Sequence, residues 1–140
     1  MNFADFLIHK LRSVMPAVAE ISESASVEEV EYNNWISKHS NQPLSHDRSL
    51  QLMQDLPCLP VDSAKVVFYC YLIDAIEKPD FDWEFLAEYL PPFLRSKTEI
   101  HKIFSNQERL AISCCLSYII CRGNQPFLLN DYLSLLERLL

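Results

Sequence analysis

Glycine is almost absent from this 140-residue chain, which contains only Gly123. Average usage would be about 7%. Loops that hold the phosphates of nucleotides need two or more closely spaced glycines, because their backbone N–H groups must approach the phosphate. Tight two-residue β-hairpin turns also use glycine. The sequence therefore excludes the glycine-rich nucleotide-binding loops and disfavours folds rich in β-hairpins.

Positive charge is also scarce, with 12 Lys and Arg against 19 Asp and Glu and a net charge of −7. Such a chain repels nucleic acid and anionic membranes, so we expect neither as a partner, whereas a basic protein fits. The longest apolar run, Ala111–Cys121, is too short to span a bilayer. The first residues lack the basic region of a signal peptide. These features predict a cytoplasmic protein.

What the chain does contain is hydrophobic periodicity of the α-helical kind, in a sequence that is 49% hydrophobic. No segment shows the alternation typical of a strand, and proline or polar clusters separate the periodic segments. The sequence predicts an all-α protein: a compact single domain over residues 1–140, built as a bundle of six or seven helices. The expected helices cover residues 3–19, 26–36, 47–56, 62–77, 82–90, 106–121 and 126–140, with a short helical turn over 99–104.

Several helix ends carry local signals. Pro16 is expected to end or kink the first helix one turn early. The patterns Ser26–Glu29 and Ser105–Glu108 are capping boxes, which start helices. Arg122 and Gly123 fit the end of a helix, by favouring its dipole and by adopting a left-handed conformation. Residues 62–77 and 106–121 are apolar on most sides, which predicts two central helices.

Cysteine and histidine do not form a recognisable reactive site. The five cysteines are odd in number and include no Cys-x-x-Cys pair, so we expect reduced thiols, mostly in the core, with Cys58 exposed. His39 and His46 flank a loop beside Asp47 but do not complete a metal ligand set. We therefore expect no metal, no cofactor and no catalytic residue. An enzyme that combines Cys58 with His39 or His46 remains a third alternative.

Acidic residues are concentrated in two segments, with five between residues 20 and 31 and six between residues 74 and 88. Aromatic residues accompany both segments, and aromatic anchors beside acids suit an interface with a basic protein. Acidic helix faces also keep proteins soluble, which is an equally strong explanation. The residues predicted to contact a partner are Glu28, Glu29, Glu31, Asp80, Asp82, Trp83 and Glu84.

A loose pattern between residues 59 and 119 joins a Leu-Pro turn to an aromatic-rich helix and then to a Phe-x-x-Gln-x-x-x-Ala element. Its residues are Leu59, Pro60, Ala64, Phe68, Tyr69, Tyr71, Leu72, Phe104, Gln107, Ala111 and Leu116. This pattern resembles a group of small helical bacterial proteins. Some small acidic helical proteins of this type are immunity proteins against toxins of contact-dependent inhibition or type VI secretion. The resemblance covers less than half of the chain and transfers no catalytic residue.

Charge and resemblance together predict an immunity protein that binds a basic toxin domain, expected to be a nuclease, through an acidic surface and occludes its active site. The alternative is a non-catalytic helical adaptor or regulatory module whose partner binds an apolar groove. The two hypotheses predict different surfaces. An exposed hydrophobic groove with dispersed acids favours the adaptor, and a continuous acidic face favours the immunity protein.

Overall fold

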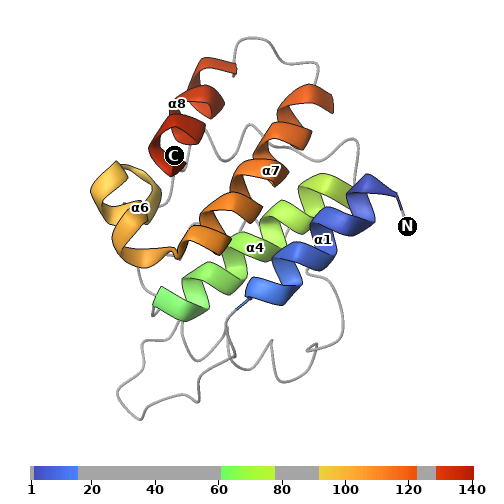
Figure 1. Ribbon diagram of the computed structural model, residues 1–140, viewed down its shortest axis with the longest axis horizontal. Helices are drawn as coiled ribbons and strands as arrows, with labels where there is room; N and C mark the ends of the chain where they lie inside the picture. Colours follow the sequence, from blue (N-terminus) through green and yellow to red (C-terminus); the bar gives the residue numbers. More distant parts are fainter. Residues whose placement is uncertain (1, 16–60, 78–91, 123–128) are drawn as a thin grey trace.

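The computed structural model describes residues 2–15, 61–77, 92–122 and 129–140. Within these residues every regular element is helical and there is no strand (Figure 1), which confirms the predicted all-α class. The expected helices at 26–36, 47–56 and 82–90 lie outside the described residues, so the total of six or seven helices and the compact single domain stay predictions. The described elements are α1 (Phe3–Val14), α4 (Val61–Glu77), the 3-10 turn η2 (Pro92–Leu94), α6 (Lys97–Ile103), α7 (Asn106–Arg122) and α8 (Leu129–Leu139).

Helix α1 is bounded by local interactions at both ends. The side chain of Asn2 accepts a hydrogen bond of 2.8 Å from the backbone of Asp5, whose carboxylate accepts one from the backbone of Asn2 in return. At the other end Met15 is already extended, with φ −67° and ψ 130°. A residue before proline is pushed out of the helical region, so Pro16 explains why the helix ends at Val14 rather than at residue 19.

Helices α1, α4 and α7 contact one another pairwise and form the centre of the described structure. Figure 1 shows α4 and α7 running in the same direction and α1 running against both. Helix α8 packs against α7 and α6, and α6 also contacts η2. Parallel packing brings the beginnings of α4 and α7 together at one end and their last turns together at the other.

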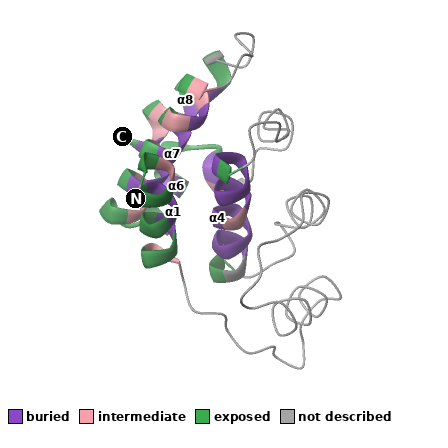
Figure 2. Ribbon diagram, turned by 90° about the vertical axis from the view of Figure 1, so that its right-hand side faces the viewer, coloured by how far each residue is buried: buried purple, intermediate pink, exposed green. Residues whose placement is uncertain are grey.

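Helix α4 is buried along nearly its whole length (Figure 2). From Ala64 to Ile76 every residue except Cys70 is buried, including the charged Lys65 and Asp74. The helix begins at Val61 and ends at Glu77, within one residue of the predicted bounds. A helix that is apolar on all sides is buried on all sides, and the prediction of a central position is confirmed.

Helix α7 agrees less well with the prediction of an enclosed helix. One side buries apolar residues, namely Ala111, Ile112, Cys115, Leu116 and Ile119. The opposite side is open to solvent at Leu110, Cys114, Ser117 and Cys121. Gln107 and Ser117 fall on this side at helical spacing, and these polar residues are the signal that distinguishes it. The predicted enclosure on most sides is wrong for this face.

The shorter elements complete the described core. The 3-10 turn brings the ring of Phe93 to 5.7 Å from that of Phe104 and 6.2 Å from that of Phe68. Helix α6 begins two residues before the expected turn because the Ser96 side chain accepts a hydrogen bond from the backbone of Glu99. Helix α8 covers Leu129–Leu139, within the predicted helix over 126–140, and the predicted start at Pro126 lies outside the described residues. Gly123 lies outside the described residues.

Candidate partner-binding groove

The residues predicted to bind a partner all lie outside the described residues. They are Glu28, Glu29, Glu31, Asp80, Asp82, Trp83 and Glu84. The second acidic segment does reach into α4, where Asp74 is only 1% exposed and Glu77 is exposed. Asp74 therefore cannot contribute to an acidic surface, which is a correction to counting it with that segment.

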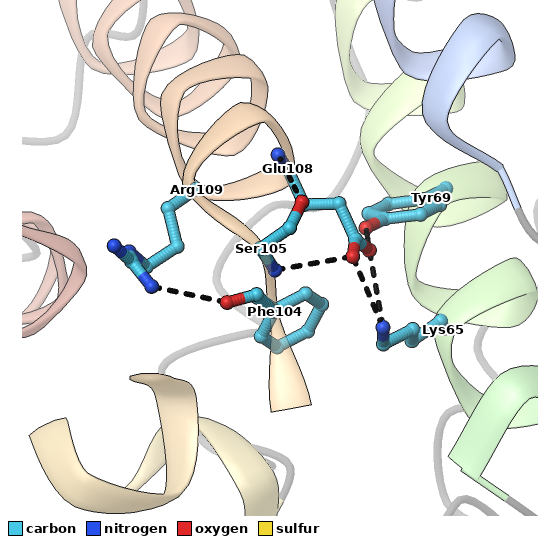
Figure 3. Close-up of polar contacts among 6 residues, drawn as sticks. All are labelled: Lys65, Tyr69, Phe104, Ser105, Glu108 and Arg109. Carbon is cyan, nitrogen blue, oxygen red and sulfur yellow. Dashed lines mark hydrogen bonds and ion pairs between the residues drawn. The ribbon is translucent and has the colours of Figure 1, made fainter. Parts of the chain in front are cut away.

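A polar cluster joins the beginning of α7 to α4 (Figure 3). The Glu108 carboxylate accepts hydrogen bonds from the Tyr69 hydroxyl and from the Lys65 ammonium, whose nitrogen lies 3.2 Å from both carboxylate oxygens. The same carboxylate accepts from the backbone N–H of Ser105 at 3.2 Å, and the Ser105 hydroxyl accepts from the backbone of Glu108. The predicted capping box at Ser105–Glu108 is confirmed, and Glu108 also holds two residues of α4.

The electrostatics of this cluster favour a structural role. Burial raises the pKa of Glu108, but the hydrogen bonds from Tyr69, the Ser105 backbone and Lys65 outweigh it, and the net shift is downward. Burial and the adjacent carboxylate raise the pKa of Tyr69 well above its usual range. Glu108 therefore stays ionised and Tyr69 stays protonated near neutral pH. A general acid or base needs a pKa near the working pH, and neither group is shifted towards it.

A second polar contact joins the other ends of the same two helices. The Arg122 guanidinium donates hydrogen bonds to the backbone carbonyls of Ala75 and Ile76, in the last turn of α4, and lies 5.2 Å from the centre of the Tyr118 ring. Carbonyls in the last turn of a helix lack partners within that helix. The sequence predicted that Arg122 favours the dipole of its own helix. In the structure its guanidinium also donates hydrogen bonds to carbonyls at the end of α4.

The exposed face of α7 and the adjacent side of α1 form an apolar groove, which we call the α1–α7 groove. Its large apolar side chains are Phe3 (58% exposed), Phe6 (44%) and Leu110 (67%). The Phe3 and Phe6 rings stack at 6.3 Å, and Phe3 meets the edge of Tyr118 at 5.8 Å. Three exposed large side chains on one face are typical of an interaction site.

Two hollows follow the line between the helices and meet at Cys114. The first, of about 360 Å³, is lined by Phe3, Ser113, Cys114, Ser117, Tyr118 and Cys121. The second, of about 410 Å³, is lined by Phe6, Leu7, Lys10, Ser13, Val14, Gln107, Leu110, Ala111 and Cys114. The only charged side chain in either lining is Lys10, whose ammonium lies 5.7 Å from the centre of the Phe6 ring.

Four of the cysteines can be placed, and all four are free thiols. Cys115 is buried and Cys70 is half-buried, and burial is the main cause that raises the pKa of each to about 12. Cys114 and Cys121 are exposed in the α1–α7 groove, so the expectation of core positions is wrong for these two. An apolar run suggested burial, but its residues alternate between two sides of α7.

Other kinds of site were also sought in the part of the chain that the structure describes. These residues contain no group of three or more His, Cys, Asp or Glu side chains that could hold a metal ion. They contain no helix long and apolar enough to cross a membrane. His39, His46 and Cys58, which the enzyme alternative requires, lie outside the described residues.

Compared with models of protein families, with curated proteins and with solved structures, the chain has no significant match. Among the described residues the α1–α7 groove is the strongest candidate site, because three large apolar side chains are exposed along it.

Proposed function

We propose that this protein is a non-catalytic helical module that binds another protein in the α1–α7 groove. The observation that carries this proposal is the exposure of Phe3, Phe6 and Leu110 together along one groove. Complete burial of such a side chain is worth roughly 1.5–3 kcal/mol. These three are about half to two-thirds exposed, so a partner that covered them would gain about 3–5 kcal/mol from them.

The remainder of the groove supports the same function. Ser113, Cys114, Ser117 and Cys121 are small, which allows a partner backbone to approach α7 closely. The described acids are dispersed over four stretches of chain and none lines the groove. An exposed apolar groove is the part of this distinction that the described residues bear on, and it favours an adaptor, whereas 11 of the 19 acids lie outside these residues.

The experiment selects binding peptides from a displayed library of amphipathic helices, using the full-length protein as bait. The affinities of the selected peptides are then measured for the wild type and for Leu110→Asp. We expect the substitution to weaken binding at least tenfold, because it places a charge in the apolar groove. Leu133→Asp is the matched control, since Leu133 is also an exposed leucine but lies on α8. Equal affinities for all three proteins would contradict the groove as the binding site.

A second candidate is the toxin-neutralising function, which the distribution of charge favours. The described residues include nine of the 12 Lys and Arg but only eight of the 19 Asp and Glu. The excess negative charge therefore belongs to the remaining sequence. In this proposal a cytoplasmic immunity protein occludes a basic toxin domain, such as a nuclease, through Glu28, Glu29, Glu31, Asp80, Asp82, Trp83 and Glu84.

The test of the second candidate uses charge reversal and salt. If acids guide encounter with a basic toxin, Asp80→Lys with Asp82→Lys lowers the association rate, and added salt lowers the wild-type rate towards the same value. Glu99→Lys with Glu137→Lys changes the net charge equally at two exposed positions outside the predicted contact set. Association that ignores salt, or that responds equally to both pairs, would contradict a specific acidic surface.

A further inference from the structure

The shape of the α1–α7 groove indicates which kind of structure fits it. Two antiparallel helices line it, and its residues recur at helical spacing, for example Phe3, Phe6 and Lys10 on α1. A third helix packs into such a surface by placing its side-chain ridges between theirs. Because the described elements are all helical, they offer no strand edge to an extended peptide. The 12 residues of α1 extend about 18 Å, which matches about three turns of a partner helix.

The charge of the groove indicates which charged side chain a partner helix should carry. Arg109, near the start of α7, is engaged with the carbonyl of Phe104 at 3.0 Å, and Arg122 is engaged with the end of α4. Lys10 is exposed, lines the groove, and has no carboxylate partner among the described residues. A purely apolar partner would partly remove water from this ammonium without replacing its hydrogen bonds. A carboxylate on the partner would instead form a charge-assisted hydrogen bond with it.

A second copy that docks through the same groove does not supply this carboxylate. The same face of another copy presents Lys10 again, and no acidic side chain is among the residues that line the two hollows. An anionic lipid surface would match the charge of Lys10. A membrane surface is broad, however, whereas the groove is concave, and the chain's net charge of −7 repels anionic lipid.

We propose that the α1–α7 groove binds an amphipathic helix of about three turns whose apolar face covers Phe3, Phe6 and Leu110 and whose carboxylate pairs with Lys10. This inference rests on the proposed protein-binding function and adds the chemistry of the partner. Apolar contact supplies most of the affinity, and the carboxylate fixes the position and direction of the helix in the groove.

The test selects partner helices on three forms of the protein and compares the charged residues that each form enriches in them. A library of 14-residue amphipathic helices, with a fixed apolar face and randomised polar positions, is selected on the wild type, on Lys10→Glu and on Lys102→Glu. Lys102 is an exposed lysine of α6 that does not line the groove, so it controls for net charge. We expect Asp or Glu to be enriched at one terminal turn on the wild type and on Lys102→Glu, and Lys or Arg to replace it on Lys10→Glu. Peptides from the wild-type selection should bind Lys10→Glu roughly five- to tenfold more weakly.

The outcomes separate this inference from the proposed function. Peptides that lose binding with Leu110→Asp but show no acidic preference, or no reversal on Lys10→Glu, would overturn the carboxylate partner and leave the groove as a binding site. Failure to select any peptide, or binding that ignores Leu110→Asp, would overturn both. Sedimentation showing self-association that Leu110→Asp abolishes would assign the groove to a second copy. Binding to phosphatidylglycerol vesicles without peptide binding would assign the groove to lipid. Either self-association through the groove or lipid binding of this kind would overturn the proposal.

Discussion

At the residue scale, Glu108 combines interactions that are usually distributed over several side chains. It caps the first turn of α7 and accepts hydrogen bonds from Lys65 and Tyr69 of α4. Its position in the capping box is local information that the sequence contains. Its contacts with α4 join residues 39 and 43 positions apart and depend on how the two helices pack.

We expect Glu108→Ala to lower the free energy of unfolding by about 2–3 kcal/mol, because it removes a helix cap and leaves the Lys65 ammonium without its carboxylate. Glu108→Gln should cost less, since glutamine can still complete a capping box. Urea unfolding followed by circular dichroism measures both. Glu137→Ala, at an exposed position of α8, should stay within about 0.5 kcal/mol of the wild type. A wild-type value for Glu108→Ala would show that the cluster contributes nothing to stability.

The lowered pKa of Glu108 predicts a pH dependence with a definite sign. The folded-state pKa lies below the ordinary value of 4.5, so the carboxylate stabilises the fold above that value. This contribution is lost as pH falls from there through the folded-state pKa. Urea unfolding at pH 7 and at acidic pH should show the difference between the wild type and Glu108→Gln shrinking on acidification. A difference that grew on acidification would contradict the assigned direction.

The thiols should divide into two classes according to exposure. We expect iodoacetamide to modify Cys114 and Cys121 rapidly in the native protein, because both are exposed in the groove. Cys70 and Cys115 should react only on unfolding, because burial keeps them as thiols and limits access. Peptide mass spectrometry with fragmentation resolves the adjacent Cys114 and Cys115. Equal labelling of these two neighbours would contradict the assigned orientation of α7.

At the scale of elements, the parallel pair α4 and α7 is fixed at both ends. The cluster at Glu108 joins the first turn of α7 to the second and third turns of α4, and Arg122 holds the last turn of α4. Both are polar interactions at the ends of two largely apolar helices. Apolar packing alone would tolerate a shift along the helix axes more readily than hydrogen bonds of fixed geometry, so the two contacts together define the register of the pair.

We expect Arg122→Gln to lower the free energy of unfolding by about 1–2 kcal/mol through loss of charged hydrogen bonds to the α4 carbonyls. Residues 108 and 122 are about 21 Å apart along α7, so the costs of Arg122→Gln and Glu108→Ala should add within about 0.5 kcal/mol. Urea unfolding of the two single variants and the double variant measures this. A strongly non-additive double variant would indicate that the two ends are coupled through the packing between them.

At the scale of the whole molecule, binding surface and core should be separable by mutation. We expect Leu110→Asp to change stability by no more than about 0.5 kcal/mol, because Leu110 is largely exposed. Leu116→Asp, on the buried side of the same helix, should prevent stable folding. Thermal unfolding followed by circular dichroism distinguishes the two. Severe destabilisation by Leu110→Asp would mean that this residue belongs to the core and not to a docking surface.

Local chemistry made much of the described secondary structure predictable. The capping box at Ser105 marked the start of α7, the restriction imposed by Pro16 was the signal for the early end of α1, and the unbroken apolar character of residues 64–76 indicated a buried α4. The candidate site was harder to predict from the sequence. The acids chosen from their density lie outside the described residues, and the groove uses residues that the sequence assigned to a core.

The sequence by itself determined helix formation in the described residues, the start of α7 and the burial of α4, because these depend on interactions within a few residues or on the average polarity of a segment. Only the tertiary structure decided which side of α7 stays open, that Arg122 serves the end of α4, and that Phe3, Phe6 and Lys10 border the same groove as Leu110. The reason is physical: a side chain's exposure depends on what packs beside it, and α1 meets α7 across about a hundred residues of chain.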